Sequence, residues 1–152
     1  MFIESPYFDH TEDLNNTFFE AFNDTVKWFT ETHRQAVNSV YDYRCKDYKG
    51  RIVNVELKVR SIDINKFDTL FIEPKKWDYL MKRWNEEKEI PLYINFFQDG
   101  SHVGVLDLRK ISTPQYKMIH LYDKGHTCFK DEERILIPTR YFMYFEYGIK
   151  KW

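Results

Sequence analysis

The sequence predicts an α+β fold in which a mixed β-sheet carries helices on its faces. Three observations support this class. Residues 53–60 alternate apolar and polar side chains, as a β-strand does. Two segments carry apolar residues at helical spacing, and short aromatic or β-branched runs recur through the remainder. The 152 residues contain no linker, repeat or low-complexity tract, so we expect residues 1–152 to form a single domain.

The N-terminal part is expected to run from a helix into a hairpin. Helical spacing of apolar residues, with Thr11 as the N-cap, predicts a helix near Glu12 to Phe29. Residues 30–37 are expected to form a second helical turn or a connection. The polar turn at residues 46–50 indicates a hairpin from about Ser39 to Arg60.

A second helix is expected to pack on this hairpin. Residues 67–73 form an aromatic, β-branched run typical of a strand, and Pro74 suits the first position of a helix. We therefore expect a helix from Pro74 to about Lys88, with its apolar stripe on the sheet face that carries the valines of residues 53–60, or on the continuation of that face. The stripe consists of Trp77, Leu80, Met81 and Trp84.

The last third is expected to consist of strands. Asp99-Gly100 marks a hairpin turn between the first two of them. Residues 141–147 are apolar on both faces, which favours a buried central strand or a dimer seam over a platform for stacked bases. The expected strands cover residues 92–97, 103–108, 117–122, 126–129, 134–137 and 141–147.

Two carboxylates and a lysine are expected to meet on the hairpin. Glu56 and Lys58 are neighbours on the polar face of their strand. Counting back from the turn places Asp42 opposite, or nearly opposite, Glu56. Such a patch can hold a divalent cation and orient a water molecule. The alternative is an ordinary half-buried strand, whose solvent face carries polar residues at every second position.

This arrangement resembles the PD-(D/E)XK nuclease superfamily. The resemblance covers about Leu14 to Leu108 and rests on the element order and on Asp42 preceding Glu56-x-Lys58. It implies a restriction-endonuclease-like fold and a small phage- or bacterial-type endonuclease, similar to junction resolvases, that hydrolyses phosphodiester bonds in DNA, including branched DNA. The chain departs from the pattern because Val40-Tyr41, not a proline, precedes Asp42.

The resemblance also implies roles for individual residues. Asp42 and Glu56 would bind Mg²⁺, or Mn²⁺, together with the backbone carbonyl of Leu57. Lys58 would activate or position the attacking water. The first helix of the family often adds another acid, for which Glu20 is the candidate, although a solvated helix face also explains it.

Other residues are candidates for substrate contact. Lys75 and Lys76 stand at a predicted helix N-terminus, where backbone amides and ammonium groups can grip a phosphate. An ordinary solvated turn explains them equally well. Arg60 and Gln35 are further candidates for neighbouring phosphates.

Composition limits the remaining choices. With 23 basic and 24 acidic residues the net charge is −1, so DNA contact must rely on local basic surface. Cys45 and Cys128 form no disulfide framework. No signal peptide or span of about 20 apolar residues is evident, so we expect no membrane partner and a cytoplasmic location in a bacterium or phage-infected host.

A homodimer fits the aromatic C-terminal run. The alternatives are a non-catalytic nucleic-acid- or protein-binding module on this fold, and a structural oligomerisation protein.

Overall fold

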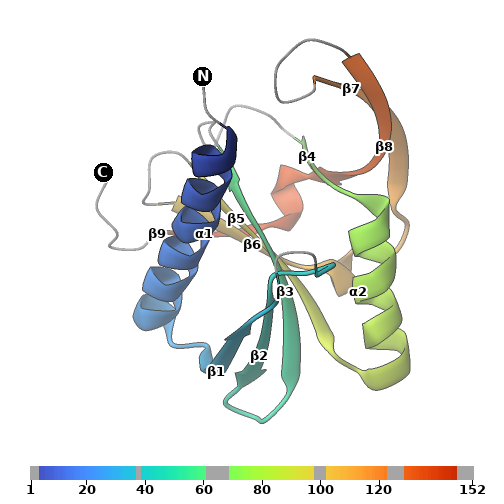
Figure 1. Ribbon diagram of the computed structural model, residues 1–152. Helices are drawn as coiled ribbons and strands as arrows, with labels where there is room; N and C mark the ends of the chain where they lie inside the picture. Colours follow the sequence, from blue (N-terminus) through green and yellow to red (C-terminus); the bar gives the residue numbers. More distant parts are fainter. Residues whose placement is uncertain (1–3, 37–38, 61–68, 98–101, 123–128, 147–152) are drawn as a thin grey trace.

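The computed structural model describes residues 4–36, 39–60, 69–97, 102–122 and 129–146 (Figure 1). Its helices and strands confirm the predicted α+β class. In chain order they are α1 (Glu4–Val26), β1 (Phe29–Arg34), β2 (Tyr43–Asp47), β3 (Ile52–Arg60), β4 (Thr69–Ile72), α2 (Pro74–Glu87), β5 (Ile90–Phe97), β6 (His102–Asp107), the 3₁₀ turn η1 (Leu108–Lys110), β7 (Gln115–Tyr122), β8 (Phe129–Pro138), the 3₁₀ turn η2 (Thr139–Tyr141) and β9 (Met143–Glu146).

The described strands form two sheets. The larger has the order β1-β2-β3-β5-β6-β9, and the smaller has the order β4-β8-β7. Strands β3 and β5 are parallel, whereas the other neighbours in both sheets are antiparallel. A parallel pair needs a crossover connection, and α2 supplies it between β3 and β5. The larger sheet is therefore mixed, as the sequence predicts.

Helix α1 covers one face of the larger sheet. Phe18 and Phe22 are buried there, and the Phe18 ring stacks on Phe96 of β5 at 5.1 Å between centroids. These side chains share one apolar core with Val55 and Leu57 of β3. The helix therefore shields the valine-rich face of β3 from water.

Helix α2 lies on the opposite face, together with the smaller sheet (Figure 1). Trp77 and Leu80 share a second core with Tyr93 of β5 and Ile135 of β8. The expectation that α2 packs on the valine-rich face of β3 is therefore wrong for these side chains. Three phenylalanines of α1 already occupy that face, and Trp84 only reaches its border.

Strand β3 is buried on both faces from Val53 to Leu57, which corrects the alternative of a half-buried strand. Its apolar residues face α1, and its polar residues lie on the side of α2. Asn54 and Glu56 are both fully buried, at 0% exposure. Solvent exposure therefore does not explain these polar residues, and each needs a partner inside the protein.

Several boundaries differ from those predicted. Helix α1 extends from Glu4 to Val26, and Lys27, at a φ of 55°, leads out of it. The segment expected to be a second helical turn is strand β1, which starts at Phe29. The predicted turn at 98–101 and residues 126–128 lie outside the described residues. The predicted strand at 134–137 is the end of the longer β8.

The C-terminal aromatic run is not a buried central strand. Its described part, β9, pairs with β6 at the edge of the larger sheet. Met143 is 51% exposed, and Phe145 packs against the core below α1.

Neither helix in the described part of the chain combines the length and apolar character that a membrane span requires.

The second core supports a stability prediction. Leu80 is fully buried, so Leu80→Ala should lower the free energy of unfolding by about 2–5 kcal/mol through lost contacts and a residual cavity. Trp84→Ala should cost less, because Trp84 is only half-buried and lies under the cations of Arg109 and Lys88. Urea unfolding measures both values, with the exposed Lys82→Ala as the control. Equal, negligible losses for Leu80 and Lys82 would contradict the packing of α2.

Candidate active site

Asp42 directly precedes β2 and is tied to β3 by two hydrogen bonds. Its backbone N–H donates to the carbonyl of Val55 at 2.9 Å. Its carboxylate Oδ2 accepts a hydrogen bond from the backbone N–H of Leu57 at 2.7 Å. The register pairs Tyr43 with Val55, so one residue further along Asp42 lies opposite Glu56. The hairpin therefore places Asp42 and Glu56 at paired positions, as the turn predicts, and the charge of Asp42 acts on the Glu56 carboxyl.

Glu56 is a buried carboxylic acid with one unsatisfied oxygen. Oε2 accepts a 2.6 Å hydrogen bond from the ammonium of Lys76, whereas Oε1 has no hydrogen-bond partner among the described residues. Burial, and then the charge of Asp42, raise the pKa of Glu56 to about 8 even though Lys76 acts in the opposite direction. A cation placed between these two carboxylates would satisfy Oε1 and favour the ionised form.

Lys58 stands two residues further along the same face of β3. Burial, and then the positive charge of Lys76, lower the pKa of its ammonium, while the charges of Glu56 and Glu73 oppose them. A lysine whose pKa is lowered releases its proton more readily near neutral pH than an exposed lysine does. Lys58 is therefore suited to exchange a proton with a bound water.

The two lysines at the start of α2 have different surroundings. Pro74 occupies the first turn, and Glu73 is the N-cap without a side-chain capping bond. Lys75 is exposed. Lys76 instead points into the protein and pairs with Glu56, so its ammonium is engaged by a carboxylate in this structure. The sequence places Lys76 at a helix N-terminus but gives no sign of this contact.

Arg60 is engaged inside the protein. Its guanidinium donates to Asn95 Oδ1 and to the hydroxyl of Tyr93, both at 2.8 Å, and to the carbonyl of Phe71 at 3.1 Å. It also lies over the Phe71 ring, 5.3 Å from the centroid. These contacts join β3 to β5 and β4. A contact with a substrate phosphate would require them to break.

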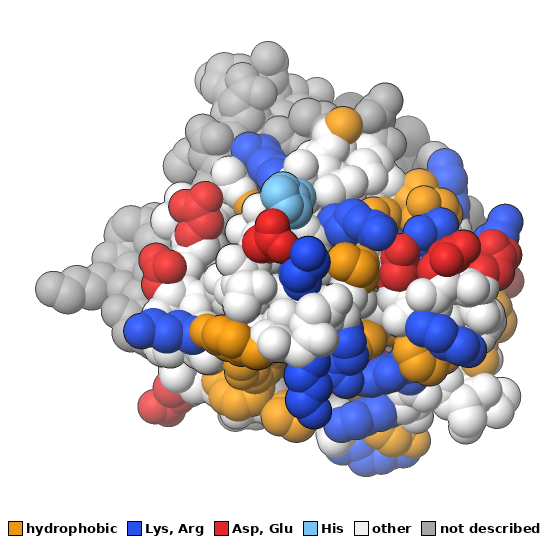
Figure 2. Space-filling view, turned by 90° about the horizontal axis from the view of Figure 1, so that it is seen from below, with side chains coloured by type: hydrophobic (Ala, Val, Ile, Leu, Met, Phe, Trp, Pro, Cys, Tyr) orange, Lys and Arg blue, Asp and Glu red, His pale blue; other side chains and the backbone are white. Residues whose placement is uncertain are grey.

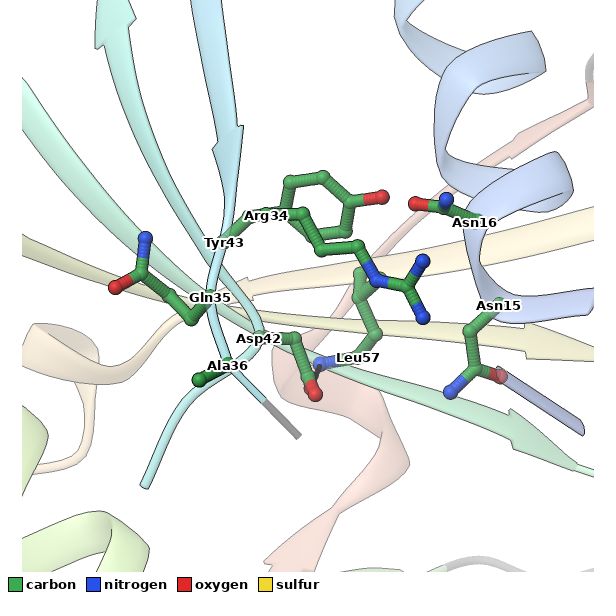
Figure 3. A pocket seen from close by; sticks show the side chains of 8 residues that line it. All are labelled: Asn15, Asn16, Arg34, Gln35, Ala36, Asp42, Tyr43 and Leu57. Carbon is green, nitrogen blue, oxygen red and sulfur yellow. Dashed lines mark hydrogen bonds between the residues drawn. The ribbon is translucent and has the colours of Figure 1, made fainter. Parts of the chain in front are cut away.

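A small polar pocket lies beside Asp42, between α1 and the start of β2 (Figure 3). Arg34 extends toward two asparagines of α1, and the pocket has a volume of about 30 Å³, enough for a water molecule. Gln35 is held by a side-chain hydrogen bond to the carbonyl of His33 at 3.0 Å. The pocket is lined by Asn15, Asn16, Arg34, Gln35, Ala36, Asp42, Tyr43 and Leu57.

Three polar atoms at this pocket are buried without a hydrogen-bond partner among the described residues: Oδ1 of Asn15, Oδ1 of Asn16 and the hydroxyl of Tyr43. The sequence reasoning missed both asparagines. Two consecutive asparagines inside a helix are poor helix formers, and that signal marks them as candidates for a functional role.

Glu20 is exposed on α1, one turn beyond these asparagines. Burial raises the pKa of Tyr43 to about 12, and the charge of Glu20 acts in the same direction. Glu20 is thus within electrostatic range of Tyr43, but it is not among the residues that line the pocket.

A second buried carboxylate, Glu89, fixes the strands next to the site. Arg44 and Asn54 donate to its Oε1, both at 2.8 Å, and Arg83 of α2 donates to its Oε2 at 2.6 Å. Although burial acts in the opposite direction, these hydrogen bonds lower the pKa of Glu89 to about 2. These hydrogen bonds connect the end of α2 to β2 and to Asn54 of β3, which lies two residues before Glu56.

The residues present fit a hard divalent cation. Among the described residues, no group of three or more His, Cys, Asp or Glu side chains converges on one point. Mg²⁺ is commonly held by one or two carboxylates and several waters, so a protein cage of three acids is not required. Asp42 and Glu56 supply such a pair, and the unpartnered Oε1 of Glu56 leaves one oxygen free to bind the ion.

No protein-family model matches the chain, and no curated protein sequence matches it. Among solved structures, the chain is similar to the Holliday junction resolvase Hjc of Archaeoglobus fulgidus. The TM-score is 0.48 at 11% sequence identity, and the similarity covers 84% of this chain and 84% of the resolvase. A TM-score under 0.5 does not establish a common fold.

The pKa of Glu56 predicts how stability depends on pH. Its ordinary value is 4.5 and its folded value is about 8, so between these pH values the folded protein keeps a proton that the unfolded chain has lost. The free energy of unfolding should therefore fall as pH rises through this window. Thermal melting of the metal-free protein, compared with Glu56→Gln at each pH, measures the effect. A difference between the two melting temperatures that stays constant from pH 4.5 to 8 would contradict the raised pKa.

Proposed function

We propose that the protein is a metal-dependent nuclease that hydrolyses phosphodiester bonds in DNA. One observation carries this proposal: a buried carboxylate with an unpartnered oxygen, Glu56, faces Asp42 and two lysines at the junction of β2, β3 and α2. A buried polar atom without a hydrogen-bond partner is costly, and acids with strongly shifted pKa values cluster at functional sites. The order of helix, hairpin, helix and strand around them agrees with the resemblance to PD-(D/E)XK nucleases.

Each residue then has a defined task. Asp42, Glu56 and the backbone carbonyl of Leu57 would hold Mg²⁺ or Mn²⁺, which supplies charge neutralisation and an acidified water when bound. The hydrogen bond from the Leu57 N–H keeps the Asp42 carboxylate facing this position. Lys58 takes up or releases the proton of the attacking water, in keeping with its lowered pKa.

Substrate contacts follow from the surroundings of these residues. Lys75 is exposed at the start of α2 and is suited to bind a phosphate. Gln35 borders the pocket beside Asp42, where it could contact the strand being cut. Glu20, exposed on α1, is a candidate for an additional acid near the same pocket.

Local basic surface supports a nucleic-acid partner despite the net charge of −1. Figure 2 shows Lys and Arg side chains gathered over the lower part of the face seen from below. A groove of about 360 Å³ is lined in part by Lys49, Arg51 and Arg109. Its two carboxylates, Asp47 and Asp107, pair with the same Arg51 and Arg109, so this lining has one more basic than acidic side chain. Binding that depends on such local charge should weaken steeply with salt.

A non-catalytic binding module is the second candidate. The ion pair between Lys76 and Glu56 favours it, because a buried acid that has a lysine partner can be purely structural.

A cleavage screen separates the two. Purified protein is incubated with linear duplex, single-stranded and four-way-junction DNA and with RNA, in Mg²⁺, Mn²⁺ or EDTA. The nuclease proposal predicts metal-dependent products that Glu56→Gln protein does not form. The nucleic acids that are cut identify the substrate class. Branched DNA is the class that the family resemblance suggests. Failure to cut any of these nucleic acids, under conditions where the protein is folded, would contradict the proposal.

A further inference from the structure

The Lys76 ammonium is bonded to one oxygen of Glu56, Oε2, directly beside the unpartnered Oε1 that a metal ion would use. Its Nζ lies 2.6 Å from Oε2 of a fully buried carboxylate, while the Lys76 side chain is itself only 22% exposed. Lys75, its neighbour in the chain, is exposed and carries the same charge. The inward direction of Lys76 is therefore specific to its position on α2.

Glu56 lies among charges of both signs. Burial and the charge of Asp42 raise its pKa, whereas the charges of Lys76 and Lys58 lower it. A divalent ion bound to Glu56 would stand within a few ångströms of the Lys76 ammonium. Two like charges at such a distance in a partly buried site repel one another strongly. The partial exposure of Lys76 gives its flexible side chain a route toward solvent.

We propose that Lys76 is the resident counter-cation of this site, and that the Lys76 ammonium and a divalent cation exclude one another at Glu56. This inference rests on the proposed function in one respect, namely that Glu56 binds a divalent ion. In the metal-free protein the Lys76 ammonium donates its hydrogen bond to Oε2 of Glu56. When the ion binds, the ammonium is released at the start of α2, beside Lys75, where it can pair with a substrate phosphate. Lys76 is thus a positioning residue whose partner changes with metal occupancy.

Amine labelling of the wild-type protein tests this exclusion. The protein is treated briefly with an amine-acylating reagent, with and without Mg²⁺, and tandem mass spectrometry compares the modification of Lys76 with that of Lys75. Without Mg²⁺, Lys76 should react about tenfold more slowly than Lys75, because its ammonium is hydrogen-bonded to Glu56 and largely buried. Saturating Mg²⁺ should raise the ratio of Lys76 to Lys75 labelling severalfold. The exposed Lys82 is the internal control, and its labelling should not change.

The Glu56→Gln variant provides a matched comparison. Without its carboxylate partner, Lys76 should react at the faster rate whether or not Mg²⁺ is present. A ratio in the wild-type protein that Mg²⁺ leaves unchanged, at concentrations that saturate the protein in calorimetry, would overturn the exclusion and leave the metal site intact. Absence of any Mg²⁺ binding in calorimetry would overturn both the proposed function and the exclusion.

Discussion

Glu56→Gln is expected to reduce Mg²⁺-dependent DNA cleavage by about 10²–10³-fold or more. Gln preserves the size of the side chain but cannot carry the negative charge that binds a cation. Glu56 is fully buried beside Asp42, and among the described residues no third acid joins the two in one cluster. Initial cleavage rates on the best substrate from the screen measure the loss, with binding of the ion followed in parallel.

The control for this loss is Glu86→Gln, which removes an exposed carboxylate from α2. That variant should cut at the wild-type rate. If Glu56→Gln also cuts at the wild-type rate, Glu56 has no part in the chemistry.

Lys58→Ala is expected to lower turnover by about 10²–10⁴-fold while ion binding is retained. Lys58 is assigned to the proton of the attacking water and not to the cation, so its loss should affect the chemical step. The control is Lys82→Ala, an exposed lysine of α2, which should leave turnover unchanged. A Lys58→Ala protein that cuts normally, or one that no longer binds the ion, would contradict this division of roles.

The fold was predictable where local patterns determine it. Pro74 and the apolar stripe behind it predict α2, which runs from Pro74 to Glu87. The turn after β2 predicts the hairpin and the position of Asp42 opposite Glu56. The face of the sheet that each helix covers was not predictable in the same way. The apolar stripes of α1 and α2 could each pack on either face. The phenylalanines of α1 pack on the valines of β3 because of how the whole chain folds, and sequence spacing does not encode that packing.

In the candidate site, too, local contacts were predictable from the sequence and long-range contacts were not. Asp42, Glu56 and Lys58 lie within one hairpin, so their proximity follows from strand register. Lys76 reaches Glu56 across 20 residues of sequence, and Glu89 reaches Arg44 across 45. Such contacts depend on how α2 docks against the sheet. The sequence shows each of these charges but not its partner, which is why the role of Lys76 at Glu56 emerges only from the structure.

Isothermal titration of the metal-free protein with Mg²⁺ tests the central claim most directly. The site predicts that wild-type protein binds the ion, that Asp42→Asn and Glu56→Gln bind it much more weakly, and that Lys58→Ala binds it as the wild type does. Because Glu56 has a pKa of about 8, binding to the wild type at neutral pH should release a proton, seen as a heat that varies with the ionisation enthalpy of the buffer. A folded wild-type protein that binds no divalent ion, or variants at Asp42 and Glu56 that bind it unchanged, would contradict the account.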